Sequence, residues 1–311
     1  MDTSYAIEAP ILLVTDLAIH FLRYEGTFER QKLEVISALA VEIKAREVVA
    51  VVGSSGSGKS LLAHAILGIL PANATVSGDL YYCGQRLSPA RIAALRGSEI
   101  ALVPQSVSFL DPLMKVGKQV MGVHRRSEDV AAVFKRYNLA PQVMDQYPFE
   151  LSGGMARRVL VAAAVIMGAK LIIADEPTPG LSEALAREAL SHLRELADAG
   201  AGVMLITHDL LMALEVSDKI AIFYAGMTVE TACKEDFQAD GQRLRHPYTK
   251  ALWRALPQNE FVPLPGTQPY SGKISASCAF YPRCTLRTDA CLHPIPLREL
   301  RGGTVRCIHA T

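Results

Sequence analysis

A predicted strand, a glycine-rich turn and a predicted helix follow one another between Glu47 and Leu70, and this order constrains the fold more than any other feature. The apolar run EVVAVV at 47–52 predicts a short buried strand, and KSLLAHAILGIL at 59–70 has a helical pattern. The residues between and at the start of that helix match the pattern G-x-x-x-x-G-K-[ST]; they are Gly53, Ser54, Ser55, Gly56, Ser57, Gly58, Lys59 and Ser60. An α/β fold that binds phosphate groups is therefore expected, with an ordinary glycine turn as the alternative.

The residue types in this loop suit a nucleoside triphosphate. Glycines let backbone N–H groups converge on phosphate oxygens without intervening Cβ atoms. Lys59 is expected to neutralise charge on the β- and γ-phosphates, and the Ser60 hydroxyl to ligate Mg²⁺. The helix that follows directs its positive end at the same anion. The loop therefore predicts a site for ATP and Mg²⁺.

A second element, LIIADE at 171–176, is an apolar strand that ends in two carboxylates. Asp175 is placed to hold Mg²⁺ through water. Glu176 could polarise the water that attacks the γ-phosphate, as a general base for phosphoryl transfer to water. A strand entering a solvated turn has the same appearance, so the prediction depends on the phosphate-binding loop being present in the same chain.

Strand-like and helical runs alternate along most of the chain, which predicts a parallel sheet with crossover helices. The start is richer in strands: Ile11–Leu22 and Val35–Lys44 are predicted strands, joined by a polar loop from Tyr24 to Lys32. The region of about 111–150 is helical and polar, and is predicted to be a subdomain inserted in the core. Beyond Phe237 periodicity fades. The expected domains are 8–237, and an extension at 238–311 that is small, irregular and metal-binding.

Composition narrows the possible partners. Half of the 311 residues are apolar, enough for a sizeable core, and 32 Lys and Arg nearly cancel 31 Asp and Glu, so no net field draws the chain to nucleic acid or lipid. The N-terminus lacks the features of a secretory signal, and the most apolar run, 159–174, is too short to cross a bilayer comfortably. We expect a cytosolic chain without a transmembrane helix, whose six cysteines are reduced.

The run LSGGM at 151–155 resembles the LSGGQ signature of ABC ATPases, and it follows the phosphate loop and precedes the carboxylate strand as in that family. Ser152 and the amides of Gly153 and Gly154 are expected at a helix N-terminus, where they could hold a γ-phosphate. The resemblance implies that this phosphate belongs to ATP bound by an opposite subunit. Two sites then require two subunits arranged head to tail.

The same resemblance assigns roles to three further residues. Gln105, at the end of IALVPQ, looks like the Q-loop glutamine that senses Mg²⁺ and the γ-phosphate and leads into the helical insert that touches the permease. His208, in Thr-His-Asp, looks like the switch histidine that contacts the γ-phosphate. Phe21 looks like the aromatic residue that stacks on adenine, although a buried core phenylalanine is an equal alternative.

One position departs from the family pattern. After the second carboxylate the family usually has an S-A-L-D loop, whereas this chain has PGLS at 179–182, with Ser182 in place of the aspartate. In the family that loop crosses the dimer interface, so unequal rates of ATP hydrolysis at the two sites are a possible consequence. A weakly hydrolysing regulatory subunit is an alternative. Because Glu176 and His208 are present, hydrolysis is predicted.

The run HPYTKAL at 246–252 resembles an element of ABC ATPases from oligopeptide, dipeptide and nickel importers. This resemblance implies import of peptides, or of nickel or metal chelates, with two separate permease subunits, an extracytoplasmic solute-binding protein and a second ATPase subunit, commonly a paralogue. The chain would then sit at the cytoplasmic face of the membrane. The alternative, an ABC ATPase acting in translation or DNA repair, is disfavoured because the chain has neither tandem ATPase domains nor a long coiled-coil insertion.

Cysteines gather near the C-terminus, where the run C-A-F-Y-P-R-C resembles the C-x-F-x-P-R-C pattern found in the same importer class. The four are Cys278, Cys284, Cys291 and Cys307. Four thiolates suit a tetrahedral zinc ion or a [4Fe–4S] cluster, and the absence of paired C-x2-4-C knuckles favours iron. The resemblance implies a [4Fe–4S] cluster; zinc, or no ligand, are alternatives. His293 and His309 are spare ligand candidates, and Cys83 and Cys233 are expected to be small buried residues.

Overall fold

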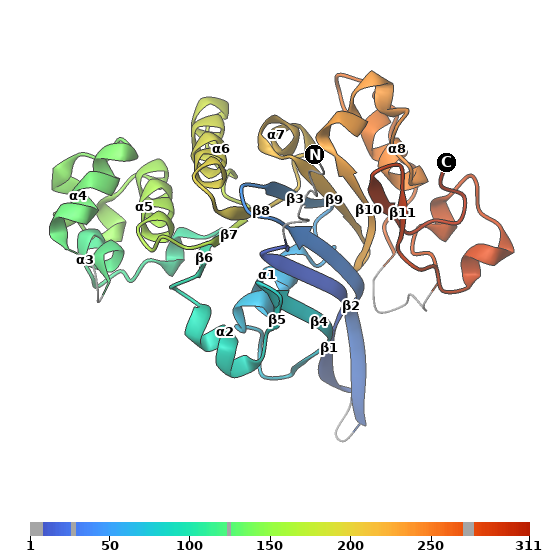
Figure 1. Ribbon diagram of the computed structural model, residues 1–311, viewed down its shortest axis with the longest axis horizontal. Helices are drawn as coiled ribbons and strands as arrows, with labels where there is room; N and C mark the ends of the chain where they lie inside the picture. Colours follow the sequence, from blue (N-terminus) through green and yellow to red (C-terminus); the bar gives the residue numbers. More distant parts are fainter. Residues whose placement is uncertain (1–8, 26–28, 123–125, 270–276) are drawn as a thin grey trace, which may run out of the picture.

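The computed structural model describes residues 9–25, 29–122, 126–269 and 277–311. Its strands form one mixed sheet, in the order β5-β4-β1-β2-β10-β9-β3-β8-β7-β6. The predicted α/β class, a parallel-sheet core with a β-rich N-terminal part and an inserted helical subdomain, is confirmed (Figure 1). Residues 1–8, which were considered above as a secretory signal, lie outside the described ranges.

The centre of the sheet is parallel. Strand β3 pairs in parallel with β8 and β9, and β7 pairs in parallel with β8 and β6. All of their carboxyl ends therefore meet at one edge, which is where ligands bind in open parallel sheets. The bounds of these strands are β3 Val48–Gly53, β6 Ile100–Val103, β7 Leu171–Asp175, β8 Gly202–Thr207 and β9 Lys219–Tyr224.

Helices cover both faces of this parallel sheet, and two cores result (Figure 1). Along β3, Val48, Ala50 and Val52 belong to one core while Val49 and Val51 belong to the other, as the two-residue period of a strand requires. One core includes residues of α5, α6 and α7, and the other includes residues of α1 and α2. These helices span α1 Lys59–Leu67, α2 Pro89–Leu95, α5 Gly153–Val165, α6 Glu183–Asp198 and α7 Leu210–Val216.

The N-terminal strands form an antiparallel layer beside the parallel core. The loop predicted from Tyr24 to Lys32 is wrong in extent, because β1 runs through Glu25 and β2 starts at Glu29, with residues 26–28 outside the described ranges. The ladder continues to the Glu25–Glu29 pair, since backbone hydrogen bonding in a two-stranded ribbon needs no apolar face. The strands are β1 Leu12–Glu25, β2 Glu29–Ile43, β4 Ala74–Tyr82 and β5 Gln85–Arg86.

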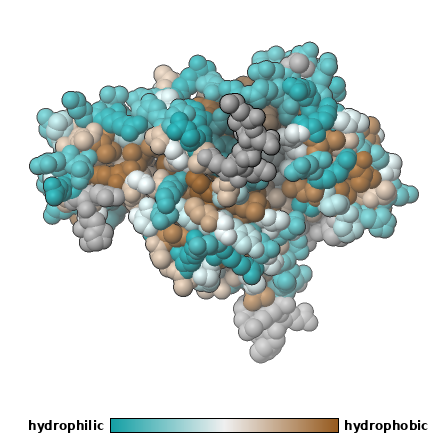
Figure 2. Space-filling model, viewed as in Figure 1, coloured by the Kyte–Doolittle hydropathy of each residue, from teal (hydrophilic) through white to brown (hydrophobic). Residues whose placement is uncertain are grey.

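The segment between β6 and β7 is helical as predicted. It contains α3 (Val116–Met121) and α4 (Ser127–Arg136), which pack with α5 at the end of the molecule opposite the C-terminal extension (Figure 1). Apolar side chains reach the surface over this end and over the extension (Figure 2). Exposed large apolar residues in or near the helical segment are Val107, Phe109, Leu113, Met114 and Phe149.

The C-terminal extension is joined to the sheet. Strand β10 (Met227–Cys233) runs antiparallel to β9, and β12 (Gly303–Val305) pairs with β10 and with β11 (Arg298–Leu300). Helix α8 (Pro247–Arg254) lies beside these strands (Figure 1). No strands are predicted from the sequence in the extension because β11 and β12 have only three residues each, too few to show the two-residue alternation of a strand.

A buried ion-pair network attaches the extension to β10. The Arg245 guanidinium lies 3.3 Å from Glu230 Oε1 and 2.9 Å from Asp236 Oδ2, and the side chains of Arg245 and Glu230 are fully buried. Glu230 also accepts the backbone N–H groups of Arg245 and His246 at 2.9 and 2.8 Å. His246 Nδ1 accepts the N–H of Tyr248 at 3.0 Å and so caps α8. The HPYT run is therefore fixed at its first residue.

The two cysteines outside the tail, Cys83 and Cys233, differ from each other in burial. Cys83 was expected to be buried and is exposed, because with Gly84 it forms the tight turn between β4 and β5, both residues having positive φ (47° and 71°). Cys233 is half-buried, so its prediction is met only in part. In the described ranges, no helix combines the length and apolarity needed to cross a membrane.

Candidate functional site

The loop that follows β3 has the conformation of a phosphate cradle. Gly56 and Gly58 have φ of 77° and 97°, values that favour glycine. A Cβ on Gly53 would lie 2.6 Å from the carbonyl oxygen of Phe223 and 2.7 Å from Ser57 Oγ, so only glycine fits there. Ser57 Oγ is buried and makes no hydrogen bond within the described chain. The loop is thus tightly folded, and the Ser57 N–H donates to the Ser54 carbonyl oxygen at 3.2 Å across the turn at Gly56.

Lys59 lies at the base of this loop. Its Nζ donates to the carbonyl oxygens of Gly53 and Ser54 at 2.8 and 3.0 Å, and stands 4.0 Å from Glu176 Oε1. Burial lowers the pKa of Lys59, while the charges of Glu176 and Asp175 oppose that effect. A buried ammonium group held by carbonyl dipoles and carboxylates is well suited to an incoming polyphosphate.

Two carboxylates at the end of β7 face the loop. Ser60 Oγ donates to Asp175 Oδ1 at 3.2 Å, which places the two expected Mg²⁺ ligands side by side. Burial raises the pKa of Asp175, and the Ser60 hydroxyl partly offsets that rise. Oxygen ligands of this kind are those that Mg²⁺ prefers, with water and phosphate completing the shell.

Glu176 is the centre of the site. Gln105 Nε2 donates to its Oε2 at 3.2 Å, and His208 Nδ1 lies 3.4 Å from its Oε1. Its backbone φ is 44°, unusual for a residue with a side chain, and its N–H donates to Ile206 O at 2.9 Å. Such backbone strain is common where a side chain must be held for function. The three residues predicted to be catalytic therefore meet at one carboxylate.

His208 owes its position to the next residue. Asp209 Oδ1 accepts the N–H groups of Leu211 and Met212 at 2.9 and 3.1 Å and so caps α7. Because β8 ends at Thr207 and α7 begins at Leu210, His208 lies on a short, fixed connection. Its side chain is 59% exposed, which leaves it accessible to a ligand.

The predicted signature residues lie apart from this cluster. Ser152 caps α5 by accepting the N–H of Met155 at 3.3 Å, and both Ser152 and Gly153 are exposed. Within the ranges described, neither they nor Gly154 hydrogen-bonds to the phosphate loop of the same chain. A helix N-terminus exposed in this way could contact an anion only from outside the chain.

Ser182 and Phe21 have plain structural positions. The Ser182 side chain accepts the N–H of Leu185 at 3.5 Å and caps α6, a role that aspartate would also fill. Phe21 is half-buried on β1 and packs against the second core.

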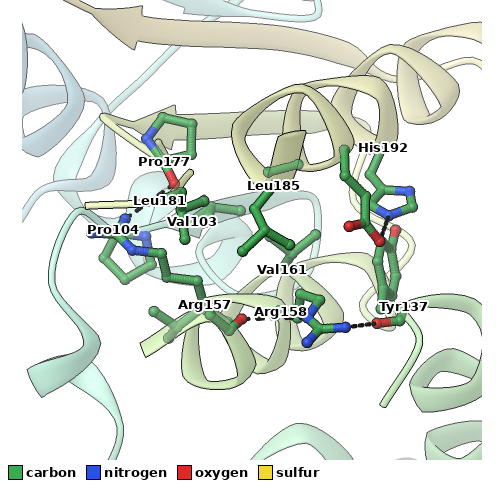
Figure 3. Close-up of a pocket in the computed structure, with 14 residues that line it drawn as sticks. Val103, Pro104, Tyr137, Arg157, Arg158, Val161, Pro177, Leu181, Leu185 and His192 are labelled. Carbon is green, nitrogen blue, oxygen red and sulfur yellow. Dashed lines mark hydrogen bonds and ion pairs between the residues drawn. The ribbon is translucent and has the colours of Figure 1, made fainter. Parts of the chain in front are cut away.

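Sequence reasoning missed a pocket behind the site, at the junction of α5, α6 and the segments after β6 and β7 (Figure 3). Arg157 of α5 reaches across it and donates to Pro177 O at 3.1 Å, one residue beyond Glu176. Burial lowers the pKa of Arg157. Arg158 bonds instead to the carbonyls of Tyr137 and Asn138. Arg157 thus links α5, the helix that begins at the LSGGM run, to the segment that follows Glu176. No local sequence motif identifies Arg157 as this link.

The four tail cysteines share one neighbourhood in the structure. Cys278 N–H donates to Cys291 O at 3.0 Å, and burial, with smaller effects from the thiols of Cys307, Cys291 and Cys284, raises the pKa of Cys278 to about 11. Yet in the described part of the chain no three His, Cys, Asp or Glu side chains converge as a metal site requires. The expected [4Fe–4S] ligand geometry is therefore not supported. His309, a spare candidate, lies 3.0 Å from the Thr288 hydroxyl.

These features define a P-loop nucleoside triphosphatase: a parallel sheet, a glycine-rich loop, a buried lysine and paired carboxylates. Comparison with known proteins narrows this class. Residues 36–179 match the family model described as ABC transporter, and residues 229–291 match the one described as oligopeptide/dipeptide transporter, C-terminal region.

Two curated relatives match over nearly their full length. The oligopeptide transport ATP-binding protein OppD of Escherichia coli is 31% identical, covering 95% of this chain and 92% of that protein. The dipeptide transport ATP-binding protein DppD of Escherichia coli is 35% identical, covering 90% of each. The chain therefore belongs to the ABC transporter ATP-binding proteins, in the branch that contains oligopeptide and dipeptide transport ATP-binding proteins.

Other relatives are longer. The chain spans about half the length of OppD of Mycobacterium tuberculosis and Mycobacterium bovis, which are 35% identical over 93% of this chain. Among solved structures, a dimeric bacterial ABC transporter cassette superposes with a TM-score of 0.62 at 22% identity, covering 72% of this chain and 98% of that one. A nucleotide-free ATP-binding cassette gives 0.59 at 22% identity, covering 72% and 91%. These structures support the fold.

Proposed function

We propose that this chain is the ATP-hydrolysing subunit of an importer for oligopeptides or dipeptides. One observation carries the proposal: the Glu176 carboxylate meets Gln105, His208 and Lys59 beside the Ser60–Asp175 pair. That arrangement brings a base, a cation and oxygen ligands to one edge of the sheet, as phosphoryl transfer to water requires.

In the proposed reaction each residue has one task. The amides of Gly53–Ser60 and the Lys59 ammonium bind the phosphates, with Ser60, Asp175 and Gln105 as the residues that would hold Mg²⁺, which supplies charge neutralisation when bound. Glu176 orients and deprotonates the attacking water. His208, 3.4 Å from that carboxylate and exposed, is placed to contact the γ-phosphate. Phe21 is proposed for adenine stacking.

A second subunit is proposed to complete the site. At the start of α5, Ser152 and Gly153 are exposed and Gly154 is half-buried, and within the described ranges none of the three hydrogen-bonds to the phosphate loop of its own chain. They would hold the γ-phosphate of ATP bound by the partner, which we propose to be a paralogous ATPase subunit. Arg157, which joins α5 to the loop after Glu176, would transmit closure of the dimer to the base.

The permease is proposed to dock on the helical segment. The exposed apolar residues that gather there, among them Phe109, Leu113 and Phe149 with exposures of 60%, 87% and 74%, form a surface suited to another protein. Two membrane permease subunits and an extracytoplasmic solute-binding protein would complete the importer, with this chain at the cytoplasmic face. Names of the relatives favour peptides as cargo; nickel import has no such support.

The four tail cysteines are proposed as ligands of a [4Fe–4S] cluster. The cysteine pattern and the shared neighbourhood of the thiols support this idea, whereas the arrangement described above lacks converging ligands. Anaerobic purification followed by iron and sulfide analysis tests it, and protein without iron would rule it out. We also propose the division into an ATPase domain at 8–237, with its helical subdomain at about 111–150, and an extension at 238–311.

The transport proposal is tested on the intact complex. Affinity purification of the full chain from membranes is expected to bring two multi-spanning permease subunits and one further ATPase subunit. After reconstitution in vesicles, ATP turnover should rise when di- or oligopeptides are supplied with the solute-binding protein, and should not respond to Ni²⁺. Stimulation by Ni²⁺ alone would contradict the cargo assignment. A wild-type complex without turnover would favour a regulatory subunit.

A further inference from the structure

The C-terminal extension reaches the phosphate-binding loop of its own chain. A segment that we call the strap, Leu264–Gln268, leads away from α8, and at its end the Ser54 hydroxyl donates to Gln268 Oε1. These two residues are 214 positions apart in the sequence. The ATP site is therefore in contact with a part of the chain that lies outside the core.

Arg283 fixes the strap in place. Its Nε donates to Pro265 O at 2.8 Å and its Nη2 donates to Leu264 O at 3.1 Å, so the guanidinium grips two successive carbonyl groups. The strap turns at Gly266, whose φ is 77° and whose missing Cβ would lie 3.7 Å from Arg283 Nε. A planar guanidinium with several donors suits this grip, and a lysine could not reproduce it.

The same arginine is anchored beside the ATP site. Arg283 Nη1 donates to the Tyr224 hydroxyl at 3.2 Å, and Tyr224 ends β9. The residue before it, Phe223, pairs with Gly53, the first glycine of the phosphate loop. The strap, through Arg283, and the phosphate-binding loop, through Gly53, are therefore both attached to the carboxyl end of β9. Because Arg283 is followed directly by Cys284, this contact also connects the cysteine-bearing tail to the loop.

Ser54 is held from two sides. Its carbonyl oxygen accepts from Lys59 Nζ at 3.0 Å, while its hydroxyl is bound by Gln268. Building on the proposed function, we propose that Gln268 is a positioning residue for the phosphate-binding loop, and that Arg283 and the strap couple the tail to ATP binding. Among the described residues, the strap hydrogen-bonds to Ser54 of the loop and to Arg283, and to none of the groups around Glu176. Its effect should therefore fall on nucleotide affinity and leave turnover at saturation unchanged.

The expected change in ATP affinity follows from the strength of one neutral hydrogen bond. A net contribution of about 0.5–1.5 kcal/mol to loop order corresponds to a change of about two- to tenfold in affinity. In the full-length protein, Gln268→Ala should raise the Kd for ATP, measured by calorimetry in EDTA, by about that factor. Gln258→Ala, an exposed glutamine just before the strap, is the matched control and should bind as wild type does.

A double-mutant cycle tests whether the contact itself is responsible. Ser54→Ala and Gln268→Ala should each weaken ATP binding, and the double variant should be no weaker than the weaker single one. Additive losses would overturn the proposal. Tighter ATP binding by Gln268→Ala would also overturn it, since the contact would then compete with nucleotide.

Arg283→Lys tests the link to the tail. It should reproduce the weaker ATP binding of Gln268→Ala, with kcat of the complex unchanged and KM raised. A KM equal to that of wild type would refute the coupling, and thermal unfolding of Arg283→Lys is measured to show that this variant folds as wild type does. The double-mutant cycle of Ser54 and Gln268 does not depend on whether Arg283→Lys folds. If wild type itself fails to bind ATP, the proposed function fails; if wild type binds and Gln268→Ala binds equally, only this inference fails.

Discussion

Acid should loosen the attachment of the C-terminal extension through His246. This imidazole is fully buried, its Nε2 has no hydrogen-bond partner in the described chain, and burial lowers its pKa from 6.5 to about 3. Glu230 accepts its backbone N–H at 2.8 Å, and the Phe280 ring lies 6.0 Å away. Folding therefore favours the neutral imidazole. Near pH 7 the unfolded chain also has a largely neutral His246, so folding loses little free energy there, whereas at lower pH folding must remove a proton from this side chain.

Proton linkage gives the direction and the size of the change in stability with pH. Because the pKa in the folded protein is below that in the unfolded chain, the unfolded state binds more protons below about pH 6.5, and stability falls as pH decreases from there toward 3. Between pH 7 and pH 5 the loss from this one group is about 2 kcal/mol. Other groups titrate in the same window, so the contribution of His246 must be isolated by substitution.

The assay is urea unfolding of the full chain at pH 7 and pH 5. His246→Asn keeps a helix-capping side chain without a titrating group, and should lose about 2 kcal/mol less stability than wild type between the two pH values. His293→Asn, which alters an exposed histidine, is the matched control and should behave as wild type. Equal acid sensitivity of wild type and His246→Asn would refute the reasoning.

Three further predictions concern single side chains. Glu230→Ala leaves the buried Arg245 guanidinium short of a partner and should lower the free energy of unfolding by about 3–5 kcal/mol in urea titrations; a loss below 1 kcal/mol would contradict the burial of this pair. Arg157→Ala should leave the Kd for ATP unchanged while turnover falls about tenfold or more, because the Glu176 loop loses its tie to α5. Iodoacetamide at pH 8, followed by peptide mass spectrometry, should label exposed Cys83 well before Cys278, whose pKa is about 11; the reverse order would contradict the described burial.

Local sequence rules predicted the elements around the site because those elements are locally determined. EVVAVV and LIIAD are buried on both faces, and each is followed at once by the functional residue that it positions. Because parallel strands end at one edge, the segments that follow β3, β6, β7 and β8 bring Lys59, Gln105, Glu176 and His208 together.

What the sequence did not predict depends on contacts between distant segments. Arg245 has the same local appearance as an exposed arginine, and its burial follows only from Glu230 and Asp236 reaching it. Strand β12 has only three residues, too few to predict from the sequence, and it pairs with β10 and β11. The contact of Gln268 with Ser54 joins residues 214 positions apart, and no local pattern marks Gln268.

The ATP turnover of the purified transporter carrying Glu176→Gln tests the central claim most directly. The account predicts that turnover falls by about 10²-fold or more, as expected on removing a general base, while the Kd for ATP stays within about twofold of wild type. Turnover equal to that of wild type would contradict the assignment of Glu176 as the base at the centre of the site.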